Sequence, residues 1–64
     1  MYEAIYSDNM DRISQAFANL DDATTWLIQQ VQTGPVNIAE GTIAYQGTIM
    51  ARFQNREGQV EKIT

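Results

Sequence analysis

The sequence predicts a small α+β domain in which one helix packs on one face of an antiparallel sheet, in the order β-β-α-β-β. Two observations predict this class. Helix-start chemistry opens an amphipathic stretch over about residues 20–33, and apolar and polar residues alternate through 41–54. A length of 64 residues allows one domain, over 1–64.

The first part of the chain favours two strands, with one ambiguity. Residues 2–7 alternate in types that favour strands, and Ser7-Asp8-Asn9 is a turn cluster. Residues 10–17 fit either a strand or a helix, because they begin a helical stripe formed by Met10, Ile13, Phe17, Leu20, Thr24, Leu27 and Val31. The alternative fold is therefore a long N-terminal helix over 8–32 followed by a β-hairpin.

The helix over 20–33 has a start signal and a stop signal. Asn19 can accept a backbone N–H bond as the N-cap, and the helix dipole favours Asp21 and Asp22 in the first turn. Gly34 is expected to supply a left-handed exit, and Pro35 forbids continuation. The stripe that faces the sheet comprises Ala23, Trp26, Leu27, Gln30 and Val31, with Trp26 as a core residue.

The period changes to two after Pro35, which indicates strands. One predicted face holds Gly41, Ile43, Tyr45, Gly47, Ile49, Ala51 and Phe53. Gln46-Gly47 is either a tight turn or a bulge within this stretch. Residues 55–58 are expected to form a hairpin loop with Gly58 at positive φ, and 59–63 a short returning strand.

The composition disfavours catalysis and metal binding. The chain has no cysteine and no histidine, which removes disulfides, the thiol nucleophile and the usual general base, and disfavours a zinc site. No glycine-rich phosphate loop occurs. Turn and cap roles account for Asp8, Asp11, Asp21 and Asp22, so we expect no enzyme, no cofactor and no metal.

The net charge of −4 is unevenly distributed along the chain. Residues 1–40 carry −5 and residues 41–64 carry +1, which disfavours direct nucleic-acid binding and favours a basic protein surface as partner. No apolar run is long enough to span a membrane, and no secretory signal opens the chain, so a cytoplasmic protein is expected.

These observations predict a protein-binding module that regulates or inhibits a larger protein. Stand-alone inhibitors of this size and character occur among phage and mobile-element products, including anti-CRISPR proteins. The acidic candidates, Glu3, Asp8, Asp11, Asp21 and Asp22, could substitute for nucleic-acid phosphates. The other candidates for partner binding are Tyr2, Tyr6 and Tyr45, as a tyrosine patch or a half-buried core edge, together with Arg52 and Arg56. The alternative function is a structural subunit of a homo-oligomer or filament, because the helical stripe on one long helix over 8–32 would need a partner helix.

Overall fold

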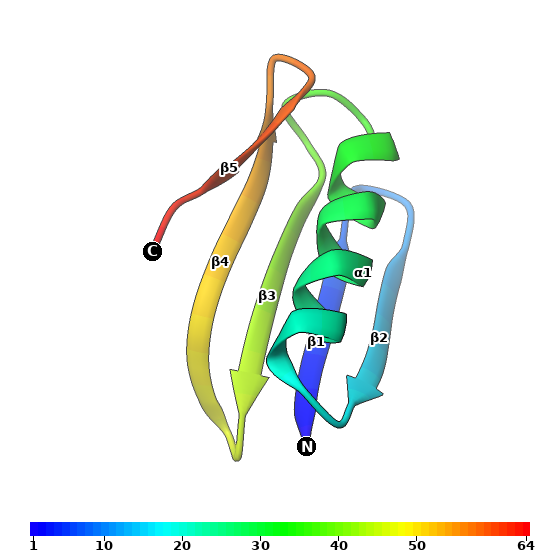
Figure 1. Ribbon diagram of the computed structural model, residues 1–64. Coiled ribbons are helices and arrows are strands. Elements are labelled where there is room, and N and C mark those ends of the chain that lie inside the picture. The colour runs from blue at the N-terminus through cyan, green and yellow to red at the C-terminus, as the bar shows by residue number, and fades with distance from the viewer.

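The computed structural model describes all 64 residues and confirms the predicted class, with one helix on one face of an antiparallel sheet (Figure 1). Helix α1 spans Leu20–Thr33, and the five strands are β1 (Tyr2–Ser7), β2 (Arg12–Phe17), β3 (Glu40–Tyr45), β4 (Thr48–Arg56) and β5 (Gln59–Lys62). Their spatial order is β2-β1-β3-β4-β5, so β2 and β5 are the two edges. At 14 residues, α1 is too short and too polar to cross a membrane.

Residues 12–17 form a strand, so the alternative of one long helix over 8–32 is wrong. Asp8 makes the turn that precedes this strand, because its Oδ1 accepts the backbone N–H groups of Met10 at 2.7 Å and Asp11 at 2.8 Å. The chain then returns beside β1 with six consecutive residue pairs from Ser7↔Arg12 to Tyr2↔Phe17. The local turn chemistry and this pairing override the helical spacing of the stripe.

Helix α1 has the predicted bounds and the predicted start. Asn19 Oδ1 accepts the N–H of Asp22 at 2.8 Å, which caps the first turn. Ala23, Leu27 and Val31 are buried against the sheet. The predicted left-handed exit at Gly34 is wrong, because this residue is extended, with φ −81° and ψ 179°. A proline disfavours the helical conformation in the residue before it, so Pro35 accounts for the extended backbone.

Two strands joined by a tight turn occupy the predicted alternating stretch. Gln46 and Gly47 both have positive φ, as a two-residue hairpin turn between β3 and β4 requires. The register then shifts once, since Ile43 pairs with Ala51 while Ala44 pairs with Ile49, which leaves Met50 as the extra residue of a bulge. Ile49 therefore does not share a face with Ile43, and its predicted position is wrong. Glu57 and Gly58 make the second two-residue turn, between β4 and β5.

The core lies between α1 and one face of the sheet. β1, β3 and β4 contribute Ala4, Tyr6, Ile43, Ala51 and Phe53 to it. Trp26 is half-buried and packs against Phe17, with their ring centroids 5.8 Å apart, so it closes the core on the β2 side. The other face of the sheet has no covering layer, as Figure 1 shows.

Candidate functional site

The uncovered face of the sheet can be assigned residue by residue from the pairing register. Residues directly opposite each other in antiparallel strands point to the same face. We call the uncovered side the open face. Its side chains are Glu3, Ile5 and Ser7 of β1; Arg12, Ser14 and Ala16 of β2; Glu40, Thr42 and Ala44 of β3; Ile49, Arg52, Gln54 and Arg56 of β4; and Gln59 and Glu61 of β5.

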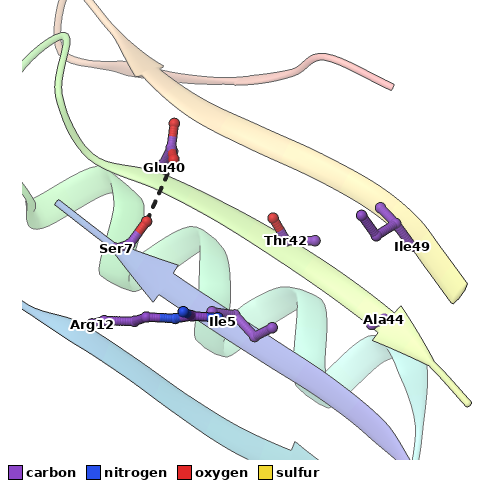
Figure 2. Close-up of a pocket in the computed structure, with 7 residues that line it drawn as sticks. All are labelled: Ile5, Ser7, Arg12, Glu40, Thr42, Ala44 and Ile49. Atoms are coloured by element: carbon purple, nitrogen blue, oxygen red, sulfur yellow. Dashed lines mark hydrogen bonds between the residues drawn. The ribbon is translucent and has the colours of Figure 1, made fainter. Parts of the chain in front are cut away.

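A shallow hollow of about 390 Å³ lies in the middle of the open face. Figure 2 shows it from this side, with α1 behind the strands. Its walls come from four strands and comprise Ile5, Ser7, Arg12, Glu40, Thr42, Ala44 and Ile49. One end is polar, where the hydroxyl of Ser7 donates to Glu40 at 3.5 Å, and the other end is apolar. Such a surface can bind a side chain that has an apolar body and a polar tip.

The β3–β4 turn places the main apolar side chain of this hollow on the open face. Ile49 is 49% exposed and lies beside Ala44, one residue pair from the β3–β4 turn. Two half-buried side chains, Ile5 of β1 and Thr42 of β3, lie toward the other side of the hollow. We call the surface formed by Ile5, the methyl group of Thr42, Ala44 and Ile49 the apolar strip. An antiparallel sheet can expose a polar face to water at little cost, whereas exposed apolar groups gain free energy when a partner covers them.

The open face holds all three arginines of the chain. Arg12, Arg52 and Arg56 are balanced there by three glutamates, so the open face as a whole is neutral. The remaining surface carries the five other acidic residues and Lys62, and thus the whole net charge of −4. Both Arg52 and Arg56, which the sequence indicated as partner-binding candidates, are exposed on this face.

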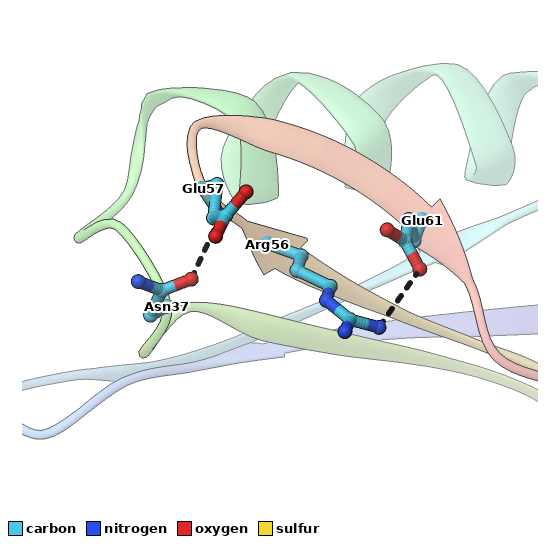
Figure 3. Close-up of polar contacts among 4 residues, drawn as sticks. All are labelled: Asn37, Arg56, Glu57 and Glu61. Carbon is cyan, nitrogen blue, oxygen red and sulfur yellow. Dashed lines mark hydrogen bonds and ion pairs between the residues drawn. The ribbon is translucent and has the colours of Figure 1, made fainter.

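Arg56 already has an acidic neighbour at the β5 end of this face. Its Nη1 lies 3.7 Å from Glu61 Oε1, and both side chains are more than half exposed (Figure 3). Such a surface ion pair contributes little to stability, so it leaves the guanidinium free to exchange partners. Behind it, Asn37 Oδ1 accepts the backbone N–H of Glu57 at 2.7 Å, which ties the loop before β3 to the β4–β5 turn.

The five acidic candidates do not form one patch. Glu3 lies on the open face, Asp8 and Asp11 lie in the β1–β2 turn, and Asp21 and Asp22 lie in the first turn of α1. The last two groups are separated by the length of β2, which is about 17–20 Å for six residues. These five residues therefore do not form a continuous acidic surface that could replace a series of nucleic-acid phosphates.

Asp8 has a structural role in the β1–β2 turn. The hydroxyl of Tyr6 donates to Asp8 Oδ2. This bond, together with the N–H groups of Met10 and Asp11, holds the pKa of Asp8 below its usual value. Burial and the neighbouring Asp8 carboxylate raise the pKa of Tyr6 to about 12. Both groups thus keep the charge states that hold the β1–β2 turn at neutral pH.

The three tyrosines share the face that α1 covers. Tyr2 and Tyr45 are paired across β1 and β3, with ring centroids 4.6 Å apart, and both are half-buried. Tyr6 is only 5% exposed and belongs to the core. The tyrosines thus lie at the core and its edge, on the side of the sheet away from the hollow.

Sequence reasoning missed the hollow, because none of the seven residues that line it was a predicted site residue. Ser7, Thr42 and Ala44 have no distinctive chemistry, and their common position depends on which sheet face α1 covers. One usable signal was Ile5, an isoleucine that alternates with Ala4 and Tyr6 and therefore had to lie on the other face.

The chain contains no group of three or more acidic, histidine or cysteine side chains placed to hold a metal ion. Comparisons with protein-family models, with curated proteins and with solved structures found no match for this chain.

Proposed function

We propose that this chain is a non-enzymatic protein-binding module that regulates or inhibits a larger protein by docking the open face on it. One observation carries the proposal. The uncovered sheet face combines an apolar strip, a hollow and all three arginines. Arginine and partly desolvated apolar groups are the residue types that dominate protein interfaces.

The charge distribution supports the open face over the acidic residues as the contact surface. The four candidate aspartates lie at both ends of the molecule, so one flat partner surface cannot engage all of them. They add a long-range field that steers approach to a basic protein. The arginines of the open face offer short-range hydrogen bonds to carboxylates and backbone carbonyls. The separation of the acidic groups therefore argues against mimicry of nucleic acid.

Size and character still favour an inhibitor of the phage or mobile-element type. Such a protein acts by occupying a surface and needs no reaction chemistry of its own. The alternative, a structural subunit of a filament, was motivated by a long exposed helix, and that helix is absent. Self-association therefore needs another surface.

Capture from cells with matched variants tests the proposal. Ile49→Glu places a charge in the apolar strip at a half-exposed position, and Thr25→Glu makes the same charge change on the exposed side of α1. We expect the wild type and Thr25→Glu to capture the same stoichiometric partner, and Ile49→Glu to lose at least tenfold in affinity for it. Circular dichroism checks that both variants fold. Equal capture by both variants would place the contact elsewhere and overturn the proposal.

A further inference from the structure

The two edges of the sheet differ in how well they are guarded against pairing. β5 has four residues, of which Glu61 and Lys62 are charged. Short length and charge are the usual protections of an exposed edge. β2 has six residues in regular register, with no proline, no lysine and no bulge. Its only charge is Arg12 at the first position, and Figure 1 shows no element beyond it.

The unguarded edge also exposes its side chains. Five of the six residues of β2 are exposed, and only Phe17 is half-buried. Ile13 is 44% exposed although it lies on the side of the sheet that α1 covers, opposite Tyr6 of β1. A stretch of five uncharged residues, 13–17, thus offers free backbone donors and acceptors beside exposed apolar groups.

The sequence of β2 complements itself in one antiparallel register. Paired residues must share a face, so the register can be centred on Gln15 opposite its own copy. Ile13 then lies opposite Phe17 of the partner subunit, and Ser14 lies opposite the partner's Ala16. No charge faces a charge, because Arg12 then lies opposite the partner's Ala18.

We propose that two copies of this chain associate through β2 in this register, forming one continuous ten-stranded antiparallel sheet. Ile13 packs against the Phe17–Trp26 pair of the other copy and so covers the β2 end of that copy's core. The twofold axis uses each β2 once. It leaves outermost β5, which is short and charged, and the first part of β4, which β5 does not pair with and which carries the Met50 bulge, so association stops at the dimer.

The dimer also enlarges the docking surface, a consequence that rests on the proposed function. Both helices lie on one side of the joined sheet, and both open faces lie side by side on the other. The molecule extends 30 × 21 × 17 Å, so one open face is smaller than the roughly 800 Å² that each partner buries in a standard interface. Two joined faces reach that size.

Light scattering after size exclusion tests the dimer on the purified chain, without any partner. We expect the wild type to be a dimer, and Gln15→Lys to be a folded monomer, because the two lysines would face each other on the axis. Gln59→Lys on β5 is the matched control and should remain dimeric. Mixing Gln15→Lys with Gln15→Glu should restore a heterodimer through opposite charges.

The absence of cysteine allows a second measurement of the same pairing. Under oxidation, Gln15→Cys should crosslink to a covalent dimer several times faster than Gln59→Cys. A wild type that stays monomeric up to millimolar concentration would overturn the proposal. So would a dimer that Gln15→Lys leaves intact, or equal crosslinking rates at the two edges. If the wild type is a monomer and Gln15→Lys no longer captures the partner, β2 would instead bind a strand of that partner. This result also overturns the dimer.

Discussion

Asn55 offers the sharpest test of how the far end of the core is held together. Its side chain is 2% exposed, its Nδ2 donates to the carbonyl of Val31 at 3.0 Å, and its Oδ1 accepts the N–H of Gly58 at 3.0 Å. Its backbone N–H donates to Ala39 at 2.9 Å. One side chain therefore joins the end of α1 to the β4–β5 turn, and the same residue anchors the loop before β3.

Asn55→Asp keeps the shape of this side chain and removes its donor. The ionised carboxylate would place an oxygen about 3.0 Å from the carbonyl oxygen of Val31. A buried charge without its partner costs about 3–5 kcal/mol. This is a large part of the stability of a domain of this size, so we expect a marked drop in the urea midpoint at neutral pH.

The cost of Asn55→Asp should depend on pH. Burial and the Val31 carbonyl raise the pKa of the new carboxyl in the folded state, and its protonated form can again donate to Val31. The stability relative to the wild type is therefore greatest below the ordinary carboxyl pKa of about 4. It falls as the pH rises from there toward the folded-state pKa.

Urea unfolding followed by circular dichroism at several pH values measures this dependence. Asn55→Ala is the control, because it loses both side-chain hydrogen bonds, at about 1–3 kcal/mol for each partner left unsatisfied, and introduces no titrating group. We expect the deficit of Asn55→Asp to shrink between about pH 7 and about pH 3 while that of Asn55→Ala stays constant. A deficit of Asn55→Asp that does not change with pH would refute the buried contact with Val31.

Three further substitutions test the packing and the turn. Gly41→Ala would place a Cβ 2.5 Å from Leu27 Cδ1, so α1 must lift from β3, and we expect a loss of about 1–3 kcal/mol in urea unfolding. Asn19→Ala removes the cap of α1 and should cost about 1 kcal/mol in the same assay. Tyr6→Phe removes the donor to Asp8, so the pKa of Asp8 should rise toward its ordinary value in a carboxyl NMR titration. We expect the wild type to lose stability between about pH 10, the ordinary tyrosine pKa, and the Tyr6 pKa of about 12, and Tyr6→Phe to lack this loss.

Each of these predictions has a contrary outcome. Wild-type stability of Gly41→Ala would mean that α1 and β3 are not in close contact. An unchanged urea midpoint for Asn19→Ala would mean that the helix does not depend on this cap. An Asp8 that titrates identically in Tyr6→Phe would show that the backbone N–H groups of the turn alone set its pKa.

The helix could be predicted from the sequence because its boundaries depend on local chemistry. Asn19 needs only the N–H groups of the next turn, and Pro35 acts on the residue before it. The strands could likewise be predicted from the local alternation of side chains, except where a turn or a bulge interrupts that alternation. Between β3 and β4, however, the two-residue turn inverts the alternation at Thr48, and the bulge at Met50 restores it at Ala51. Ile49 falls between the two inversions, so simple alternation placed it on the wrong face.

The candidate site was less predictable than the fold because it depends on long-range placement. Arg52 and Arg56 were identified from their own chemistry, and both lie on the open face. The sequence left open whether the tyrosines form an exposed patch or a half-buried core edge, because alternation cannot say which face the helix covers. The acidic residues cluster in the sequence and separate in space, because β2 places its own length between Asp11 and Asp21.

Gly34 shows how one residue can be correctly singled out for the wrong reason. The sequence indicated a glycine needed for a left-handed exit, yet the residue is extended, a conformation open to alanine. Space is the constraint instead, because a Cβ at this position would collide with the hydroxyl of Tyr6 and lie 2.6 Å from Ala39 Cβ. The two explanations differ in a double-mutant cycle. If packing is the reason, Gly34→Ala should cost less in a Tyr6→Phe background, where one of the two obstructing groups is gone. An identical cost in both backgrounds would refute the packing explanation at Tyr6 and leave the Cβ of Ala39 as the obstructing group.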